Sequence, residues 1–251
     1  MGNSVAPGAT NENLFYFVQV SDIHLSKFHQ YRYDQLFTFC NETIPIISPE
    51  FVINTGDISD SIRDPSMFFY MNEQNIEEWN QYQEILSSAG YYNKSFWLDI
   101  KGNHDMFAVK ALGAPNNYYK SFGVYGDEDQ YTFVSAHSFG SYQFVSIDLT
   151  FELGASSPYQ FFGKIPKSFD EFKESLENSN NYNHTIVFGH YPRVTSFSNF
   201  PWEILSKNKV ISYLCGHLHS AKMVKRMSEG HYELELEVCF FLFFSFIFSN
   251  Q

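Results

Sequence analysis

Residues 51–60 read Phe-Val-Ile-Asn-Thr-Gly-Asp-Ile-Ser-Asp, an apolar run that leads into a glycine and two carboxylates. The run from Phe51 to Thr55 is short and continuous, which is typical of a strand buried on both faces of a parallel sheet. Open α/β sheets place their ligand sites at the carboxyl ends of such strands. The stretch therefore predicts an α/β fold, with Asp57 and Asp60 at a functional edge of the sheet.

The same arrangement, an apolar run followed by Asp, Asn or His, occurs four more times along the chain. The polar segments are Ser21-Asp22-Ile23-His24, Gly102-Asn103-His104-Asp105, Gly189-His190 and Gly216-His217-Leu218-His219. Each segment alone says little, because a turn aspartate or a hydrogen-bonded core histidine explains most such pairs. Five of them in succession, each at the end of a predicted strand, indicate one shared site.

Seven of the side chains in these segments are candidate oxygen or nitrogen ligands for a metal, and no cysteine joins them. They are Asp22, His24, Asp57, Asn103, His190, His217 and His219. A structural zinc ion takes four ligands in a tetrahedron, so seven donors are too many for one such site. Two ions that share a carboxylate account for the whole set. Divalent or trivalent Mn, Fe or Zn all suit these donors, and the order of affinities does not choose among them.

The ordered motifs D-x-H, G-D, G-N-H-D, G-H and G-H-x-H resemble the calcineurin-like metallophosphoesterase superfamily over residues 14–225. Within it they are similar to the transmembrane-protein-62-like subgroup, whose members carry additional C-terminal membrane segments. The resemblance implies a four-layer fold, in which a mixed β-sandwich is flanked by helices. It also implies that one metal is held by Asp22, His24 and His219, that the second is held by Asn103, His190 and His217, and that Asp57 bridges the two. In addition, it implies that His104 protonates the leaving oxygen and that Asp60 orients His104.

The resemblance implies a dinuclear metal-dependent hydrolase of phosphomonoesters or phosphodiesters, in which a metal-bridging hydroxide attacks phosphorus in line. The protein-phosphatase branch of the superfamily continues the G-D-x-x-D element with Arg-Gly. This chain has Ser61-Ile62 there, which argues against a serine/threonine protein phosphatase. The alternative is a catalytically inert or ligand-sensing scaffold on the same fold. Loss of metal ligands would mark the inert scaffold, and none is lost here. Retention of His104 and Asp60 disfavours the ligand-sensing protein, because a pure binder needs no proton donor.

Composition restricts the partners. The net charge of −12 over 251 residues argues against nonspecific nucleic-acid binding. It does not exclude a phosphorylated small-molecule, lipid or nucleotide substrate, because bound metals supply local positive charge. The three cysteines, Cys40, Cys215 and Cys239, are odd in number and far apart, so no disulfide framework is expected and buried thiols are the simplest interpretation.

The chain divides into three parts: a flexible segment at residues 1–13, one domain at 14–237 and an apolar tail at 238–251. The first segment lacks a basic start and an apolar stretch, so no cleavable signal peptide is expected, and a cytoplasmic and a membrane-associated location are both left open. The tail contains Val-Cys-Phe-Phe-Leu-Phe-Phe-Ser-Phe-Ile-Phe, about half the length of a membrane span. It is a final strand, a membrane fragment that would associate the chain with a bilayer, or the product of a misplaced gene end.

Periodicity and turn residues place the remaining elements. Helices are expected at 33–43, ended by Pro45 and Pro49, at 72–89 before Gly90, and from a capping box at Ser168-x-x-Glu171 through Leu176. Antiparallel hairpins are expected at 131–149 and, near the end of the domain, at 224–227 with 232–238. The segments 65–92 and 153–166 are expected to shape the substrate pocket.

Overall fold

The apolar runs before the first three polar segments form a small parallel sheet. Its strands are β1 (Val18–Val20), β2 (Val52–Asn54) and β5 (Trp97–Asp99), in the order β1-β2-β5. These strands come from a computed structural model that describes residues 14–64, 71–150, 162–165, 168–195, 200–219, 225–226 and 232–235. All three strands are fully buried, as continuous apolar runs predict.

The later apolar runs form a larger mixed sheet in the order β10-β11-β9-β8-β7-β6. Its strands are β6 (Thr132–His137), β7 (Gly140–Ile147), β8 (His184–Gly189), β9 (Val210–Cys215), β10 (Lys225–Arg226) and β11 (Tyr232–Glu235). The pairs β6–β7 and β10–β11 are antiparallel, which confirms both predicted hairpins, whereas β7, β8, β9 and β11 run parallel. Consequently β8 and β9 deliver their polar segments to the same sheet edge.

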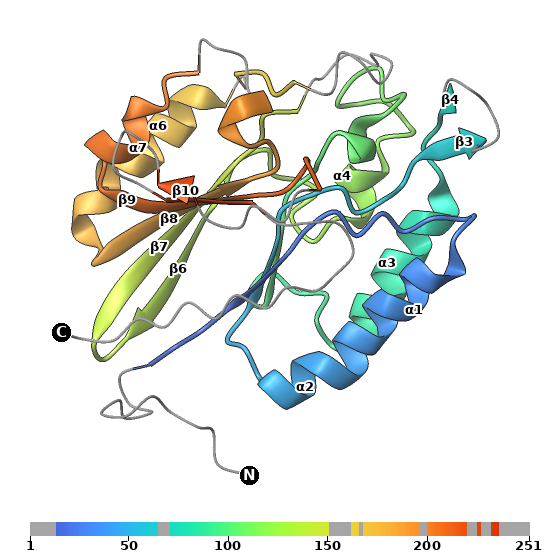
Figure 1. Ribbon diagram of the computed structural model, residues 1–251, viewed down its shortest axis with the longest axis horizontal. Helices are drawn as coiled ribbons and strands as arrows, with labels where there is room; N and C mark the ends of the chain where they lie inside the picture. Colours follow the sequence, from blue (N-terminus) through green and yellow to red (C-terminus); the bar gives the residue numbers. More distant parts are fainter. Residues whose placement is uncertain are drawn as a thin grey trace.

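The two sheets pack face to face, and helices cover their outer faces (Figure 1). Aromatic rings fill the space between the sheets: Phe51 of the small sheet lies 5.0 Å, centroid to centroid, from Phe144 of the large one. On the outer side of the large sheet a second cluster joins Phe172, Leu205 and Tyr213. The predicted four-layer α/β/β/α architecture is thereby confirmed.

The helices are α1 (Gln30–Thr38), α2 (Ile44–Ile47), α3 (Ile76–Ser88), α4 (Tyr118–Phe122), α6 (Phe169–Glu177) and α7 (Glu203–Lys207). The prediction that Pro45 ends the first helix is wrong. A π-helical turn, Phe39–Thr43, connects α1 to α2, and Pro45 lies in the first turn of α2, where its missing N–H is not needed. The helical run ends instead at Ser48, which adopts a left-handed conformation.

Other local predictions had mixed outcomes. Gly90 follows α3 with φ of +80°, as expected of the residue after a helix end. Helix α6 forms where predicted, but Ser168 makes no side-chain capping hydrogen bond, so the capping box is wrong. The short hairpin β3 (Ile62–Asp64) with β4 (Met71–Asn72) was not predicted.

The structure does not describe the two terminal segments of the chain. Residues 1–13 and 238–251 both fall outside the described residues, so the predicted domain limits of 14 and 237 stay predictions. Among the helices that the structure describes, none has both the length and the apolar character needed to cross a membrane.

Candidate metal centre

The five polar segments converge where the carboxyl ends of both sheets meet. Five of the seven predicted ligands adopt positive φ, which only about a few per cent of non-glycine residues do; they are Asp22, His24, Asp57, His217 and His219. Such conformations cost about 1–3 kcal/mol each and persist only where the surrounding structure fixes them. Their concentration here marks these loops as the functional part of the fold.

Two glycines allow the central loops to approach each other. Gly56 has φ of +97°, and a Cβ added to it would lie 2.7 Å from the main-chain nitrogen of Gly102. A Cβ on Gly102 would in turn collide with the carboxylate of Asp57. The glycine before each ligand is therefore required by the close contact of the two loops, and not only by the turn.

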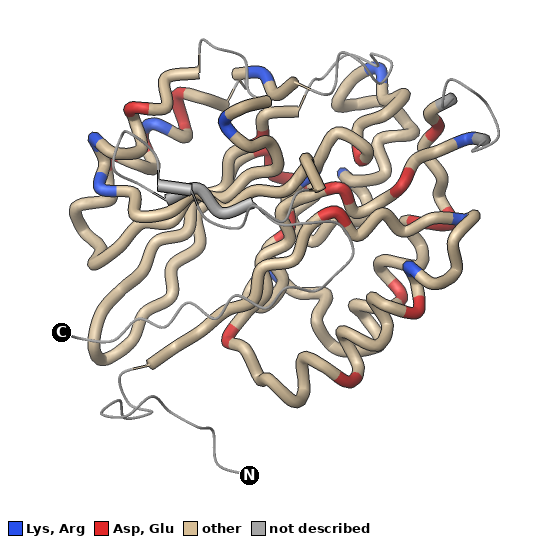
Figure 2. Tube along the Cα trace, in the orientation of Figure 1, with Lys and Arg blue, Asp and Glu red and all other residues tan. Residues whose placement is uncertain are grey.

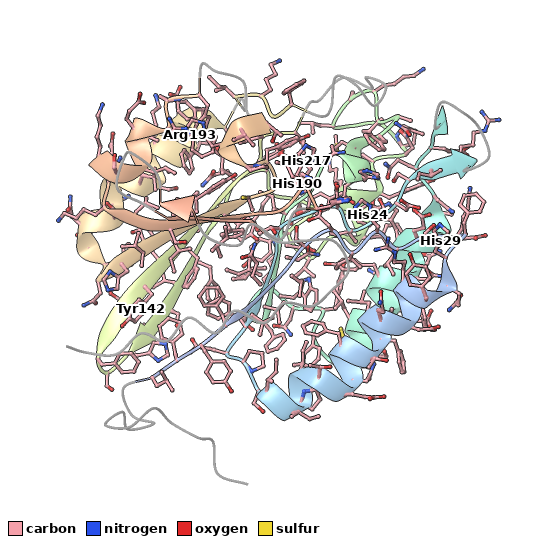
Figure 3. The ribbon with its side chains drawn as sticks, viewed as in Figure 1. His24, His29, Tyr142, His190, Arg193 and His217 are labelled. Carbon is pink, nitrogen blue, oxygen red and sulfur yellow. The ribbon has the colours of Figure 1, made fainter. Side chains whose placement is uncertain are left out.

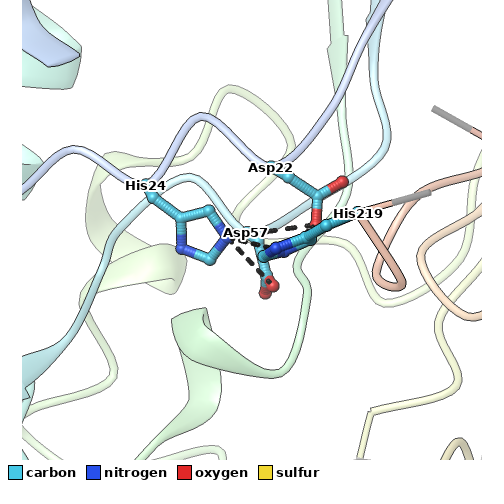
Figure 4. Close-up of side chains that lie close together, drawn as sticks. All are labelled: Asp22, His24, Asp57 and His219. Atoms are coloured by element: carbon cyan, nitrogen blue, oxygen red, sulfur yellow. Dashed lines mark hydrogen bonds and ion pairs between the residues drawn. The ribbon is translucent and has the colours of Figure 1, made fainter. Parts of the chain in front are cut away.

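The first cluster joins Asp22, His24, Asp57 and His219, whose donor atoms lie within 4.8 Å of one another (Figure 4). The Nε2 atoms of His24 and His219 are 3.2 Å apart. Asp22 Oδ1 lies 3.2 Å from Nε2 of His219. Three of these residues are buried and His219 is exposed, so the cluster is closed toward the core and open on one side. Two imidazole nitrogens and two carboxylates facing a common point fit a transition-metal ion.

The second cluster joins Asp57, His190 and His217, all buried. Asn103, an amide that completes the predicted ligand set, lies beside them: its Oδ1 is 2.9 Å from Nε2 of His190 and 2.7 Å from Nδ1 of His217. The remaining ring nitrogen of His190, Nδ1, lies 2.9 Å from the carbonyl oxygen of Thr55. A histidine that donates Nδ1–H to a carbonyl keeps Nε2 free for a metal. In Figure 3 His190 and His217 are drawn together with His24 beside them, whereas Tyr142 lies far along the large sheet.

Asp57 belongs to both clusters. Its Oδ2 lies 3.3 Å from Nε2 of His190 and 3.7 Å from Nε2 of His24. Its Oδ1 accepts the main-chain N–H of His104 at 2.8 Å, which fixes the carboxylate plane. The carboxylate is thus placed between the clusters, as a bridging ligand requires. Figure 2 shows acidic residues in the loops at the centre of the molecule, where these contacts are made.

The charges of the site are strongly coupled. Burial lowers the pKa of His24 to about 3, so this ring is neutral and ready to bind a metal. Burial would also lower the pKa of His190, but the negative charge of Asp57 outweighs it and raises the pKa to about 9. Burial would raise the pKa of Asp57, and the positive charges of His190 and His104 hold it well below its usual range. Without a metal, Asp57 and His190 therefore form a buried ion pair.

This ion pair predicts proton release on metal binding. Below about pH 9 the free protein carries a proton on His190, which must leave before Nε2 can bind an ion. Metal affinity should therefore rise with pH and level off above about pH 9. Calorimetric titration of Mn²⁺ into metal-free protein at neutral pH, in buffers of different ionisation enthalpy, measures the protons released. The variant His190→Ala should release about one proton fewer, and equal release by both proteins would contradict the prediction.

His104 lies beside the clusters on a 3₁₀ turn, His104–Met106, and is half-buried. It lines a cavity of about 440 Å³ together with Asp57 and His217, among other residues. The predicted partnership with Asp60 takes a different form from the one expected. Nδ1 of His104 lies 2.7 Å from the main-chain oxygen of Asp60, whereas the Asp60 carboxylate lies 3.7 Å from Nδ1 of His24. Asp60 thus contacts both histidines, one through its backbone and one through its side chain.

Asp105 is a site residue to which the sequence motifs assigned no role. Its buried carboxylate accepts main-chain N–H groups of Gly102, Ser59 and Ile58 at 2.8 to 3.2 Å. Burial and the charge of Asp57 raise its pKa to about 7, and these N–H donors act in the opposite direction. Asp105 ties the loop after β5 to the loop after β2. The only feature of the sequence that could have pointed to Asp105 as a site residue was its place in the Gly-Asn-His-Asp segment.

Comparison with known proteins supports the family expected from the sequence motifs. A family model described as calcineurin-like phosphoesterase matches residues 15–221. "Transmembrane protein 62" of Mus musculus is 37% identical over 238 residues, which cover 93% of this chain and 36% of that protein. This chain therefore spans about a third of the length of that relative. The predicted similarity to the transmembrane-protein-62-like subgroup is confirmed.

Solved structures agree on the fold. TT1561 of Thermus thermophilus superposes with a TM-score of 0.53 at 11% identity and covers 90% of either chain. GAP50, the anchor in the inner membrane complex of Plasmodium, superposes with a TM-score of 0.53 at 14% identity, over 95% of this chain and 79% of that one. These likenesses show the architecture alone. The family model, which spans every segment of the candidate metal centre, establishes that this chain belongs to the calcineurin-like phosphoesterase family.

Proposed function

We propose that this chain is a dinuclear metal-dependent hydrolase of phosphomonoesters or phosphodiesters. The observation that supports the proposal most directly is the position of Asp57, whose Oδ2 approaches a histidine of each ligand cluster. Under this proposal Asp22, His24 and His219 hold one ion, and Asn103, His190 and His217 hold the other. Two bound ions would supply hydroxide at neutral pH and offset the negative charge of the phosphate.

The residues around the ions have separate tasks in this proposal. Thr55 accepts from Nδ1 of His190 and so keeps Nε2 directed at the second cluster. The main-chain oxygen of Asp60 keeps a proton on Nδ1 of His104, which leaves Nε2 to transfer a proton. Because His104 lines the cavity, its Nε2 can deliver that proton to the leaving oxygen. The Asp60 carboxylate, 3.7 Å from Nδ1 of His24, adds negative charge beside that ring without a direct hydrogen bond.

The metal content of the purified chain is the first test. We expect about two transition-metal ions per chain, because the two clusters share one carboxylate and each retains further donors of its own. Mass-spectrometric metal analysis after loading with excess Mn²⁺ measures the number. Saturation at one ion would contradict the dinuclear site and leave a mononuclear enzyme as the simpler explanation.

The competing proposal is an inert or ligand-sensing scaffold, and an activity panel separates the two. Hydrolysis of p-nitrophenyl phosphate and bis-p-nitrophenyl phosphate with added Mn²⁺ reports monoesterase and diesterase activity. Loss of turnover in Asp57→Asn and in metal-free protein shows that the activity belongs to this site. Full metal loading with no turnover on any ester would favour the scaffold. The natural substrate that we propose is a phosphorylated small molecule, lipid or nucleotide, and association with a membrane through the tail belongs to the same proposal.

A further inference from the structure

Gln74 is a buried amide whose contacts lead to the turn that carries His104. It lies between β4 and α3, and only 6% of its surface is exposed. Its Nε2 lies 2.9 Å from the main-chain oxygen of His104 and 3.0 Å from that of Phe107. It also lies 2.9 Å from Oγ of Ser61. The two carbonyl groups belong to the start of the His104 turn and to the residue that follows it, so one amide group holds both ends of that turn.

The orientation of this amide is fixed by Trp79. The indole Nε1 lies 3.1 Å from Oε1 of Gln74, and an indole N–H can only donate. The oxygen of the amide must therefore face Trp79, and its NH₂ group must face the three acceptors. Trp79 is fully buried between Tyr82 and Tyr119, whose rings lie 6.3 and 6.1 Å away, so the indole has little freedom to move.

The two amide hydrogens are shared in a definite way. Asp105 accepts N–H groups at both carboxylate oxygens, so the hydroxyl of Ser59, 3.2 Å from Oδ1, donates to it. Ser61 lies 2.8 Å from Ser59 and donates in turn. Gln74 then supplies one hydrogen to Ser61, which leaves the other for the carbonyls of His104 and Phe107. The amide and the Asp105 carboxylate thus anchor the same loop through one continuous set of hydrogen bonds.

His104 is consequently held at three points. Asp57 accepts its main-chain N–H, Asp60 contacts its ring nitrogen, and Gln74 donates to its carbonyl. We propose that Gln74, oriented by Trp79, is a positioning residue that fixes the imidazole of His104 at the leaving oxygen of the substrate. This inference rests on the proposed role of His104 as proton donor. Nothing in the sequence motifs assigns Gln74, because it lies outside all five segments.

The test uses Gln74→Met, which keeps the length of the side chain and removes its donors. A displaced imidazole should lower kcat on phenyl phosphate and diphenyl phosphate by about 10-fold to 100-fold. The matching p-nitrophenyl esters should lose less, because their leaving group needs little protonation. KM and metal content should change little, since Gln74 contacts no predicted ligand side chain. The matched control is Gln83→Met, the same substitution at a half-buried position of α3, which should leave both rates unchanged.

A double-mutant comparison separates positioning from a general structural effect. If Gln74 acts only through His104, adding Gln74→Met to His104→Ala should lower turnover no further than about twofold, which is the usual uncertainty when the effects of two mutations are compared. A full second loss there would show that Gln74 acts on the site at large and would overturn the proposal. Trp79→Phe, which frees the amide and keeps an aromatic ring, should shift the phenyl-to-nitrophenyl ratio in the same direction and decides the matter if Gln74→Met does not fold.

The experiments distinguish failure of the proposed function from failure of the positioning role alone. If His104→Ala reduces both ester classes equally, the proton-donor role itself is wrong and the inference falls with it. If His104→Ala discriminates between them while folded, metal-loaded Gln74→Met and Trp79→Phe do not, the proposed function stands and the positioning role of Gln74 is refuted.

Discussion

Asp57→Asn is expected to lower kcat/KM by at least about 10³-fold. Metal ions stabilise the transition state by several kcal/mol, and about 1.4 kcal/mol corresponds to a factor of ten in rate. The carboxylate lies 3.3 Å from His190 and 3.7 Å from His24, so its charge serves both clusters at once. Asparagine removes that charge and retains one oxygen. Metal content should fall below two ions per chain, and initial rates measured with added Mn²⁺ test the loss of activity.

The comparison variants for Asp57→Asn are Asp22→Ala and His219→Ala, each of which removes a ligand assigned to one ion only. Asparagine tolerates the positive φ of +53° at position 57, so the backbone of the loop should survive the substitution. Thermal melting of the metal-free proteins checks this. If Asp57→Asn keeps more activity than either comparison variant, Asp57 is not the bridging ligand.

That these side chains lie together was predictable because each candidate ligand follows a buried strand. Parallel strands bring their carboxyl ends to one edge, so apolar runs that end in Asp57 or His190 specify their own meeting place. The helical run past Pro45 was not predictable from the same rules. Its continuation depends on a π-helical turn that no periodicity reveals.

Local backbone conformation and individual side-chain contacts were harder to predict. His24 and His219 adopt a left-handed backbone because the surrounding loops fix it in three dimensions; histidine is enriched among the few non-glycine residues with positive φ, but the sequence does not say which histidines adopt it. The Asp60 carboxylate lies 3.7 Å from His24, while the ring of His104 hydrogen-bonds to the Asp60 backbone, and these side-chain directions are not encoded by spacing. Gln74 reaches the His104 turn from the short link between β4 and α3, and a buried amide leaves no pattern in a single sequence.

The second large effect is expected for His104→Ala, which should lower turnover on esters with poor leaving groups by about 10²–10⁴-fold, the usual range for general acid catalysis. Metal content should be retained, because His104 is not assigned as a ligand. Its main-chain N–H, which binds Asp57, is also retained in alanine. A p-nitrophenyl ester should suffer less than a phenyl or alkyl ester, because nitrophenolate leaves without being protonated.

The matched control for His104→Ala is His29→Ala, which removes an exposed histidine at the start of α1 that belongs to neither ligand cluster and does not line the cavity, and which should leave all rates unchanged. Phosphate release from each ester, followed with metal-loaded protein, gives the leaving-group dependence directly. A loss of equal size on alkyl, phenyl and nitrophenyl esters would reject proton donation. The His104 ring also packs against Phe107, at 4.4 Å between centroids. Equal losses would therefore mean that His104 shapes the cavity and that water protonates the leaving oxygen.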